Sequence, residues 1–222
     1  MAQNPWHITK LKELRTSKLE KVINKFQEEN SHLMNIPKFK HIKNALSTIQ
    51  EDSELIINKK SFNIAHICCV AQLQPTYINN VRDGIAIYLS NFMLKINHDI
   101  EGFSVCFNSI KLKEKEPITL NNDPTVMFLK ISFKLLVIVL KENYKIKVKI
   151  NNIEPSNMRM GIFGLIEAVM VDENFKDFYY EGKNNTFVRN NMTYSINDII
   201  SFTIRKITHA DSGTNVKLLG FV

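Results

Sequence analysis

Apolar residues in the N-terminal 60 positions follow the spacing that is typical of amphipathic helices. In the first half they recur at about three- and four-residue steps: Leu11, Leu14, Leu19, Val22, Ile23 and Phe26. This pattern predicts a first helix with Thr9 as a candidate N-cap, and a break at residues 35–37. A second helix is predicted over residues 37–50, because proline is well tolerated in a first helical turn. Its apolar face comprises Phe39, Ile42, Ala45, Leu46 and Ile49. We therefore expect residues 1–60 to form a helical N-terminal extension.

The central part of the chain, residues 61–140, predicts a small sheet with one helix. Residues 62–73 are apolar on both faces, as in a strand that lies in the middle of a sheet. Asn80 is a candidate N-cap for a following helix. The apolar stripe of that helix comprises Val81, Ile85, Leu89, Phe92, Met93 and Ile96. Further strands are expected at residues 103–112 and, after a polar loop, at 126–140. The order β-α-β-β indicates a sheet with a helix on one face.

Short strands dominate the pattern from residue 141 onward. Lys145, Lys147 and Lys149 alternate strictly with apolar residues, which predicts a half-buried strand. Other strands are expected at residues 158–163, 165–171, 199–207 and 216–222, with a weaker one at 187–188 between the third and fourth of the five. A hairpin turn at residues 211–213 joins the last two. Five short strands in this segment indicate a closed five-stranded barrel of the OB type over residues 141–222. The whole chain is therefore predicted to be α+β.

Composition and charge exclude several classes of protein. The 222 residues are 44% hydrophobic and carry a formal net charge of +7, which are values of a globular chain rather than a disordered one. The most apolar window is interrupted by lysines and is too short for a membrane span of about 20 residues. The first 30 residues lack the apolar segment of a secretory signal. Cys68, Cys69 and Cys106 are expected to be reduced, buried thiols of an intracellular protein.

No pattern of catalytic or metal-binding residues is found in the sequence. The histidines are His7, His32, His41, His66, His98 and His209. No two of them have a metal-binding spacing, and none is spaced from a cysteine as in a zinc finger. Phosphate-binding glycine loops and the nucleophile motif GxSxG are absent. His209, Asp211 and Ser212 have the residue types of a triad, but neighbours on one hairpin do not converge as a triad must. We expect no enzyme activity, catalytic residue, metal or cofactor.

Basic residues on the predicted barrel are candidates for RNA binding. OB folds bind single strands with a charged groove and stacking aromatic residues. The candidates on the barrel strands are Lys145, Lys147, Lys149, Arg159, Phe163 and Arg205. A solvated outer face is the alternative interpretation for each lysine. Residues 141–222 contain 11 basic and 9 acidic side chains and no clear pair of stacking aromatics. Binding is therefore expected to be weak, salt-sensitive and tolerant of sequence.

The N-terminal segment is also basic. Its cations alternate with three glutamates and are Lys10, Lys12, Arg15, Lys18, Lys21 and Lys25. Such spacing suits a solvated helix with ion pairs. The apolar stripe favours an arm that packs on a partner, since an isolated amphipathic helix needs a surface to bury against.

Residues 73–112 contain the most specific pattern in the chain. The positions that carry it are Pro75, Tyr77, Asn80, Gly84, Ile85, Leu89, Gly102, Ile110, Lys111 and Leu112. This stretch resembles the tip domain of the larger stalk subunit of multisubunit RNA polymerases, with RNA polymerase I as the most similar version. Residues 160–166 and 202–205 resemble two barrel strands of the same family. The resemblance covers about residues 62–222 in the right order.

The chain also departs from the family pattern. Met160 stands where the family usually has a histidine before the glycine that corresponds to Gly161. The insertion at residues 173–186 is short, whereas RNA polymerase I members often carry long acidic tracts there. Residues 1–60 match nothing in the family.

The resemblance implies a non-catalytic polymerase subunit in the nucleus and nucleolus. The tip domain, residues 61–140, would dock on the large polymerase subunits near the clamp. It would dock through the loop around residues 110–117, with Ile110, Lys111, Leu112 and Pro117. Tyr77 and Gly84 would help to shape the tip fold around that loop. The barrel would guide nascent ribosomal RNA, and the stalk would contact an initiation factor and a smaller stalk partner, with no membrane involved. The alternatives are the stalk subunit of RNA polymerase III or II, or a free-standing OB-fold RNA-binding protein.

Overall fold

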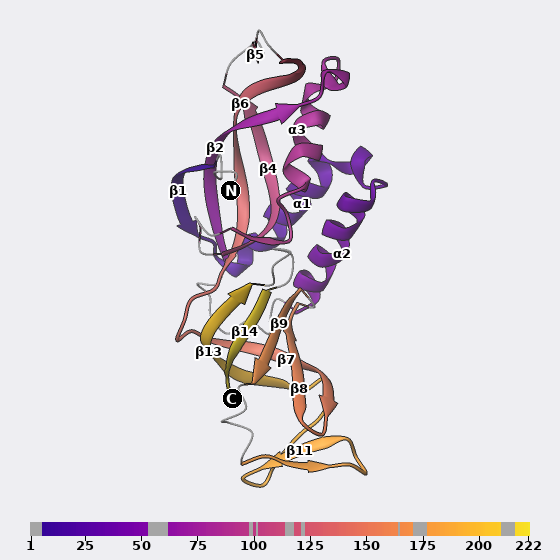
Figure 1. Cartoon of the computed structure of the whole chain (residues 1–222), viewed down its shortest axis with the longest axis vertical. Coiled ribbons are helices and arrows are strands. Elements are labelled where there is room, and N and C mark those ends of the chain that lie inside the picture. The colour runs from indigo at the N-terminus through magenta and orange to yellow at the C-terminus, as the bar shows by residue number, and fades with distance from the viewer. Residues whose placement is uncertain are drawn as a thin grey trace. The chain divides into compact units, whose positions relative to one another are not determined.

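The computed structural model describes residues 6–52, 62–97, 100, 102–113, 118–120, 123–163, 165–170, 177–209 and 216–222. In this part of the chain the fold is α+β, with three α-helices, an antiparallel sheet and a C-terminal five-stranded closed barrel (Figure 1). The chain divides into two compact units. The first unit combines residues 1–47 with 59–139, and the second combines 48–58 with 140–222.

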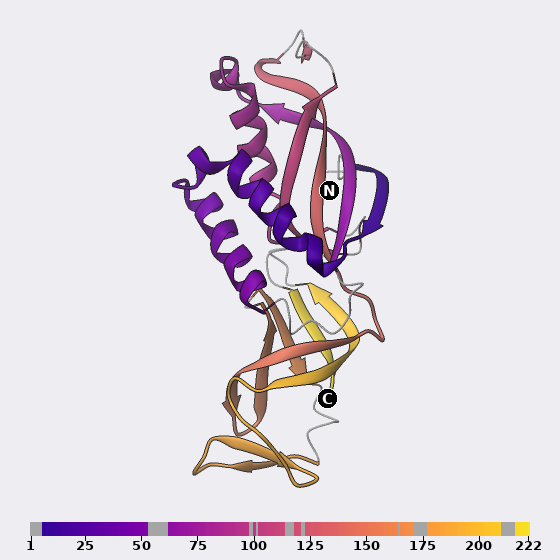
Figure 2. The same cartoon turned by 180° about the vertical axis from the view of Figure 1, so that it is seen from behind.

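The first unit is built on a six-stranded sheet. Its strands are β1 (His7–Glu13), β2 (Phe62–Leu73), β3 (Lys95–Asn97), β4 (Gly102–Leu112), β5 (Ile118–Leu120) and β6 (Asp123–Val139). They lie in the order β1-β2-β6-β4-β3, with β5 paired to β6. The helices are α1 (Leu19–Glu29), α2 (Pro37–Asp52) and α3 (Val81–Ser90), joined by the short 3-10 turns η1 (Thr16–Lys18), η2 (Ser31–Leu33) and η4 (Pro75–Tyr77). Figures 1 and 2 show α1 against one face of the sheet.

Strand β2 is a central strand, as its sequence predicts. It pairs with β6 along its whole length, from Phe62 opposite Ile138 to Leu73 opposite Met127. Its other edge is paired with β1. Strand β1 covers residues 63–68 of this edge, so both edges are paired in the first half of β2, where the backbone hydrogen bonds are satisfied away from water.

The prediction for residues 7–18 is wrong. Residues 7–13 form strand β1 instead of a helix, and α1 begins only at Leu19. Thr9 caps no helix, because its hydroxyl donates to the backbone oxygen of His66 at 3.0 Å. The physical reason is non-local, since an open edge of β2 offers a full ladder of backbone partners that outweighs a weak helical periodicity.

The helical segment is not a separate extension, because its apolar face is buried in the first unit. Phe26 of α1, Phe39 of α2 and Phe107 of β4 are all 0% exposed. The ring centroids of Phe26 and Phe107 are 5.4 Å apart, and those of Phe26 and Phe39 are 6.3 Å apart. The stripe that predicted a partner-binding arm therefore packs against the chain's own sheet, and the compact unit does not begin near residue 61.

Of the two remaining helix predictions, the one for α2 is confirmed and the one for α3 is too long. Helix α2 begins at Pro37 as predicted, and all five residues of its predicted apolar face are buried. Helix α3 follows Asn80 as predicted but ends at Ser90, short of the predicted stripe. The Ser90 hydroxyl and the Asn91 amide both donate to the backbone oxygen of Ile87, at 2.7 and 3.2 Å. These bonds satisfy an orphan carbonyl of the last turn and stabilise its end. Ile96 lies on β3 instead.

The second unit contains the barrel. Its strands are β7 (Lys145–Glu154), β8 (Asn157–Ile162), β9 (Ile166–Met170), β13 (Ile199–His209) and β14 (Val216–Phe221). They close in the order β13-β14-β9-β8-β7. All pairs are antiparallel except β9 with β14. Numbered along the chain this order is 1-2-3-5-4, so the predicted barrel is confirmed as five-stranded, closed and OB-like. The predicted turn at residues 211–213 lies outside the described residues.

A small sheet interrupts the barrel between β9 and β13. Its strands are β10 (Tyr179–Glu181), β11 (Thr186–Arg189) and β12 (Met192–Tyr194). Phe187 is buried at its centre, with its ring centroid 6.1 Å from that of Phe178 and 5.5 Å from that of Tyr180. Of these three strands the sequence predicted only the one at residues 187–188.

Candidate functional site

The three lysines predicted to contact RNA lie along the outer side of β7. Lys145 is exposed, and Lys147 and Lys149 are half-buried. The neighbouring strand β13 places Thr203 opposite Lys145 and Ser201 opposite Lys147. Ammonium groups with adjacent hydroxyls form a surface that suits phosphate oxygens. This surface, made by Lys145, Lys147, Lys149, Ser201 and Thr203, is called the barrel face below.

The other three predicted RNA-binding residues differ in their exposure to solvent and in their partners. Arg159 of β8 is exposed, and its guanidinium lies 3.9 Å from the carboxylate of Glu154, which offsets part of its charge. Arg205 of β13 is exposed. Phe163 is only 5% exposed, so its ring is buried and is not presented to solvent for stacking on a base. The sequence does not indicate this burial, because it depends on tertiary packing just beyond the end of β8.

An exposed aromatic residue that the sequence did not single out lies on the small sheet. Tyr179 is 72% exposed on β10. Beside it, the guanidinium carbon of Arg189 lies 5.0 Å from the ring centroid of Phe178, within the range of a cation–π contact. Arg189 also donates to the backbone oxygen of Val222 at 3.0 Å. The run of aromatics at residues 178–180 is the signal that could have found this surface.

Tyr77 and Gly84, predicted to shape the tip, are in close contact. A Cβ atom added to Gly84 would lie 2.7 Å from Cβ and 2.8 Å from Cγ of Tyr77. Both distances are shorter than normal carbon contacts, so only glycine lets the first turn of α3 approach η4 this closely.

Replacing Gly84 by alanine is therefore expected to lower the free energy of unfolding of the first unit by about 1–3 kcal/mol, the usual cost of overpacking. Chemical denaturation followed by circular dichroism measures the change. The matched control is Gly182→Ala, where an added Cβ would lie 3.6 Å from its nearest neighbour, a ring carbon of Tyr180. Equal losses for both variants would contradict the close-contact explanation.

The predicted docking residues lie at the end of β4. Ile110 is half-buried, whereas Lys111 and Leu112 are exposed, Leu112 by 49%. Lys111 lies opposite Ser132 of β6. An exposed leucine beside a lysine at a strand end is compatible with a contact surface. Pro117 lies outside the described residues.

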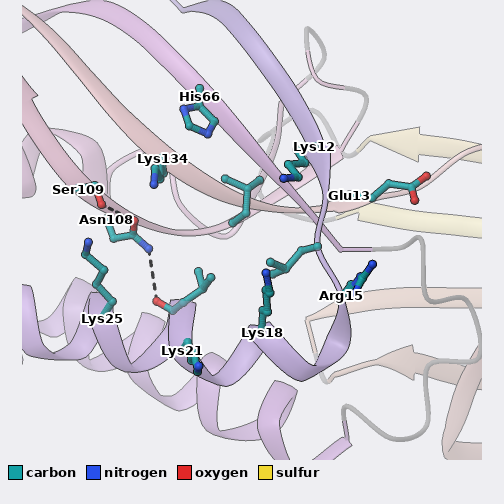
Figure 3. Close-up of a pocket in the computed structure, with 13 residues that line it drawn as sticks. Lys12, Glu13, Arg15, Lys18, Lys21, Lys25, His66, Asn108, Ser109 and Lys134 are labelled. Carbon is teal, nitrogen blue, oxygen red and sulfur yellow. Dashed lines mark hydrogen bonds between the residues drawn. The ribbon is translucent and has the colours of Figure 1, made fainter.

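A basic pocket in the first unit was not predicted from the sequence. Its volume is about 610 Å³, and its walls come from the end of β1, η1, α1, β2, β4 and β6 (Figure 3). The charged side chains that line it are Lys12, Glu13, Arg15, Lys18, Lys21, Lys25 and Lys134, together with His66. In Figure 3 Lys18, Lys21 and Lys25 lie on one side of the hollow, and His66 and Lys134 lie on the other. Six cations thus surround one space with a single carboxylate.

Strand register and two hydrogen bonds create the basic pocket. Lys10, His66, Lys134 and Asn108 are partners across four adjacent strands, from β1 through β2 and β6 to β4. The Asn108 amide donates to the backbone oxygen of Val22 at 3.4 Å, and the backbone N–H of Ser109 donates to Glu29 at 2.8 Å. These bonds tie α1 to β4 and hold the two walls in place.

The electrostatics of the basic pocket are strongly one-sided. Burial lowers the pKa of His66, and the positive charges of Lys134, Lys10 and Lys12 lower it further. The imidazole is therefore mainly neutral at pH 7. The ammonium of Lys25 lies 3.7 Å from the carboxylate of Glu29. The remaining five cations have no carboxylate within 4 Å among the residues that the structure describes: Lys12, Arg15, Lys18, Lys21 and Lys134.

The cysteine thiols, and any group that could hold a metal ion, bear on the chemistry of the described part of the chain. No group of three His, Cys, Asp or Glu residues there could hold a metal ion. Burial raises the pKa of the Cys69 thiol to about 12, with a contribution from Cys68, and burial also raises the pKa of Cys106. Both thiols therefore stay protonated and unreactive at neutral pH. Cys68 is half-buried rather than buried. Among the helices described, none is long and apolar enough to cross a membrane.

Comparison with known proteins adds no family to these observations. No protein-family model matches the chain, and a search of curated proteins finds no match.

Proposed function

We propose that the chain is a non-catalytic stalk subunit of a DNA-directed RNA polymerase, of the RNA polymerase I kind. In this role the first unit is the tip domain that docks on the large polymerase subunits near the clamp. The OB-type barrel lies beside the path of nascent ribosomal RNA. The location is the nucleus and nucleolus, and the stalk also contacts an initiation factor and a smaller stalk partner.

The observation that carries the proposal is the order of the two units along the chain. A sheet unit that contains β2, α3, β4 and β6 is followed directly by a five-stranded barrel with OB-like connectivity. The positions that resemble the stalk family map onto both units in sequence order. The contact between Gly84 and Tyr77 supports the proposal further, because these two residues belong to the resembling pattern and depend on each other sterically.

The proposed mechanism is scaffolding combined with electrostatic guidance. Exposed residues at the end of β4, with Lys111 and Leu112 among them, take part in docking. The barrel face contacts the phosphates of emerging RNA, with Arg159 and Arg205 as further cations. The absence of an aromatic pair on this face favours binding that is weak and tolerant of sequence, which suits an RNA that only passes by.

Affinity purification of the tagged full chain from its own cells, followed by mass spectrometry, tests the proposal. Recovery of the large subunits of RNA polymerase I is the expected result. Recovery of the large subunits of RNA polymerase III or II instead would keep the stalk role and change the polymerase class.

A free-standing RNA-binding protein is the second candidate function. The observation in its favour is the OB-like barrel with a basic outer strand, which needs no polymerase to bind RNA. Recovery of RNA and processing factors without any polymerase subunit would favour this candidate and contradict the stalk proposal.

A further inference from the structure

We propose that the basic pocket of the first unit binds a small molecule that carries several clustered phosphate groups. The pocket lies between the sheet and α1, and none of the residues that line it belongs to the barrel face or to the predicted docking residues. The inference does not depend on the role proposed above.

The charge of the basic pocket favours an anionic ligand. Six cations and one carboxylate line it, which leaves a net charge of about five when His66 is neutral. Five of the cations lack a carboxylate partner within 4 Å among the described residues. Like charges this close together raise the free energy of the unliganded unit, so an anion that enters gains attraction from several of them at once.

The size of the basic pocket favours clustered phosphates over a passing nucleic-acid strand. A volume of about 610 Å³ lies within the range of small-molecule sites. Treated as a cube, this space is roughly 8.5 Å across, so a strand with one charge per 3.4 Å would bring about two or three charges into it. This negative charge is about half of the net positive charge that lines the pocket. A compact ligand with several phosphates matches the charge within the same volume.

The chemistry of the lining also argues against recognition of bases. The lining residues include no Phe, Tyr or Trp that could stack on a base. The Asn108 amide donates to the backbone oxygen of Val22 at 3.4 Å, and the Ser109 hydroxyl donates to the side-chain oxygen of Asn108 at 3.0 Å. The donors left for a ligand are mainly lysine ammonium groups, with those of Lys12, Lys21 and Lys134 among them. Ammonium groups act as point charges toward phosphate oxygens and carry no base specificity.

His66 provides a direct spectroscopic reporter of occupancy. Its charged neighbours are Lys10 and Lys12 on β1 and Lys134 on β6, with the cations of η1 and α1 across the pocket. A bound phosphate cluster would counter the repulsion that these cations exert on the protonated imidazole. The pKa of His66 is therefore expected to rise on binding.

Titration calorimetry of the full chain with inorganic tripolyphosphate tests the proposal. The test variant is Lys21→Ala/Lys134→Ala, which removes one exposed cation from each wall. The matched control is Lys40→Ala/Lys43→Ala, which removes two exposed lysines of α2 that do not line the pocket. Loss of two charge-assisted hydrogen bonds is expected to weaken binding at least tenfold in the test variant, with less than a twofold change in the control.

Two further readouts separate binding from a folding defect. Both variants should keep the circular dichroism spectrum and melting temperature of the unliganded parent protein, since all four lysines are exposed. NMR of the parent chain should show the His66 ring signals shift with tripolyphosphate, and those of the exposed His41 on α2 remain unchanged. At one hundred times the Kd, the ligand should raise the melting temperature by about 5–10 °C.

Four outcomes would overturn the proposal. They are no heat of binding with tripolyphosphate, an equal loss in test and control variants, no movement of the His66 signals on saturation, or tighter pocket-dependent binding of oligouridylate or of a polyglutamate peptide than of tripolyphosphate. Tighter binding of oligouridylate would make the pocket part of a nucleic-acid path, and tighter binding of polyglutamate would make it a site for acidic protein segments.

Discussion

Deleting residues 1–60 is expected to abolish the cooperative unfolding transition of the first unit and to cause aggregation. The deletion exposes the whole edge of β2 that β1 covers, and an open apolar strand edge is a template for association. It also removes Phe26 and Phe39 from their contacts with Phe107, which leaves a large buried ring without partners. Thermal unfolding and size-exclusion chromatography of the truncated chain measure both effects.

A single substitution tests the same packing of the N-terminal segment without removing it. Phe26→Ala should lower the free energy of unfolding by about 3–5 kcal/mol, as is usual for a buried phenylalanine. Leu11→Ala is the control, because Leu11 is 49% exposed on β1 and should change stability by less than about 1 kcal/mol. A truncated chain that stays monomeric and melts like the full-length protein would show that the N-terminal segment is dispensable.

Replacing Lys145, Lys147 and Lys149 together by alanine is expected to weaken binding of single-stranded RNA strongly and to reduce its salt dependence. Each phosphate contact with a single strand contributes about 0.7 to the slope of log K against log salt, so loss of three contacts should flatten the slope by up to about 2. Fluorescence anisotropy with labelled oligouridylate over a series of salt concentrations measures both quantities.

The control for this variant must remove the same charge elsewhere. Lys40, Lys43 and Lys183 are exposed lysines outside the barrel face, and their combined replacement by alanine also lowers the net charge by three. The control should leave the slope nearly unchanged, because surface charges at a distance are screened at physiological salt. An unchanged slope in the triple β7 variant would place the RNA elsewhere on the chain.

Several elements could be predicted from the sequence because their signals are local. The apolar face of α2 and the alternation along β7 each follow from the period of one element, and both match the structure. The central position of β2 follows from its apolar character on both faces. The barrel was predictable because five short strands leave few other ways to bury their apolar sides.

Other features could not be predicted because they depend on residues far apart along the chain. Strand β1 is weakly patterned, with Leu11 exposed, and becomes a strand only because β2 offers an edge. Phe163 directly follows β8, and its burial depends on tertiary packing rather than on its own sequence context. The basic pocket joins side chains from Lys12 to Lys134, and no sequence spacing indicates that they meet.

The sequence by itself determined the types of most elements, the α+β class and the presence of a barrel with a basic first strand. These properties depend on the periodicity of apolar residues, which is a local consequence of helix and strand geometry. Only the tertiary structure decided that the N-terminal segment belongs to the sheet unit, that Phe163 is a core residue, and that lysines from β1, η1, α1 and β6 surround one pocket. Those outcomes depend on strand pairing and ring packing between segments distant in sequence, whose free energy is gained only when the fold closes.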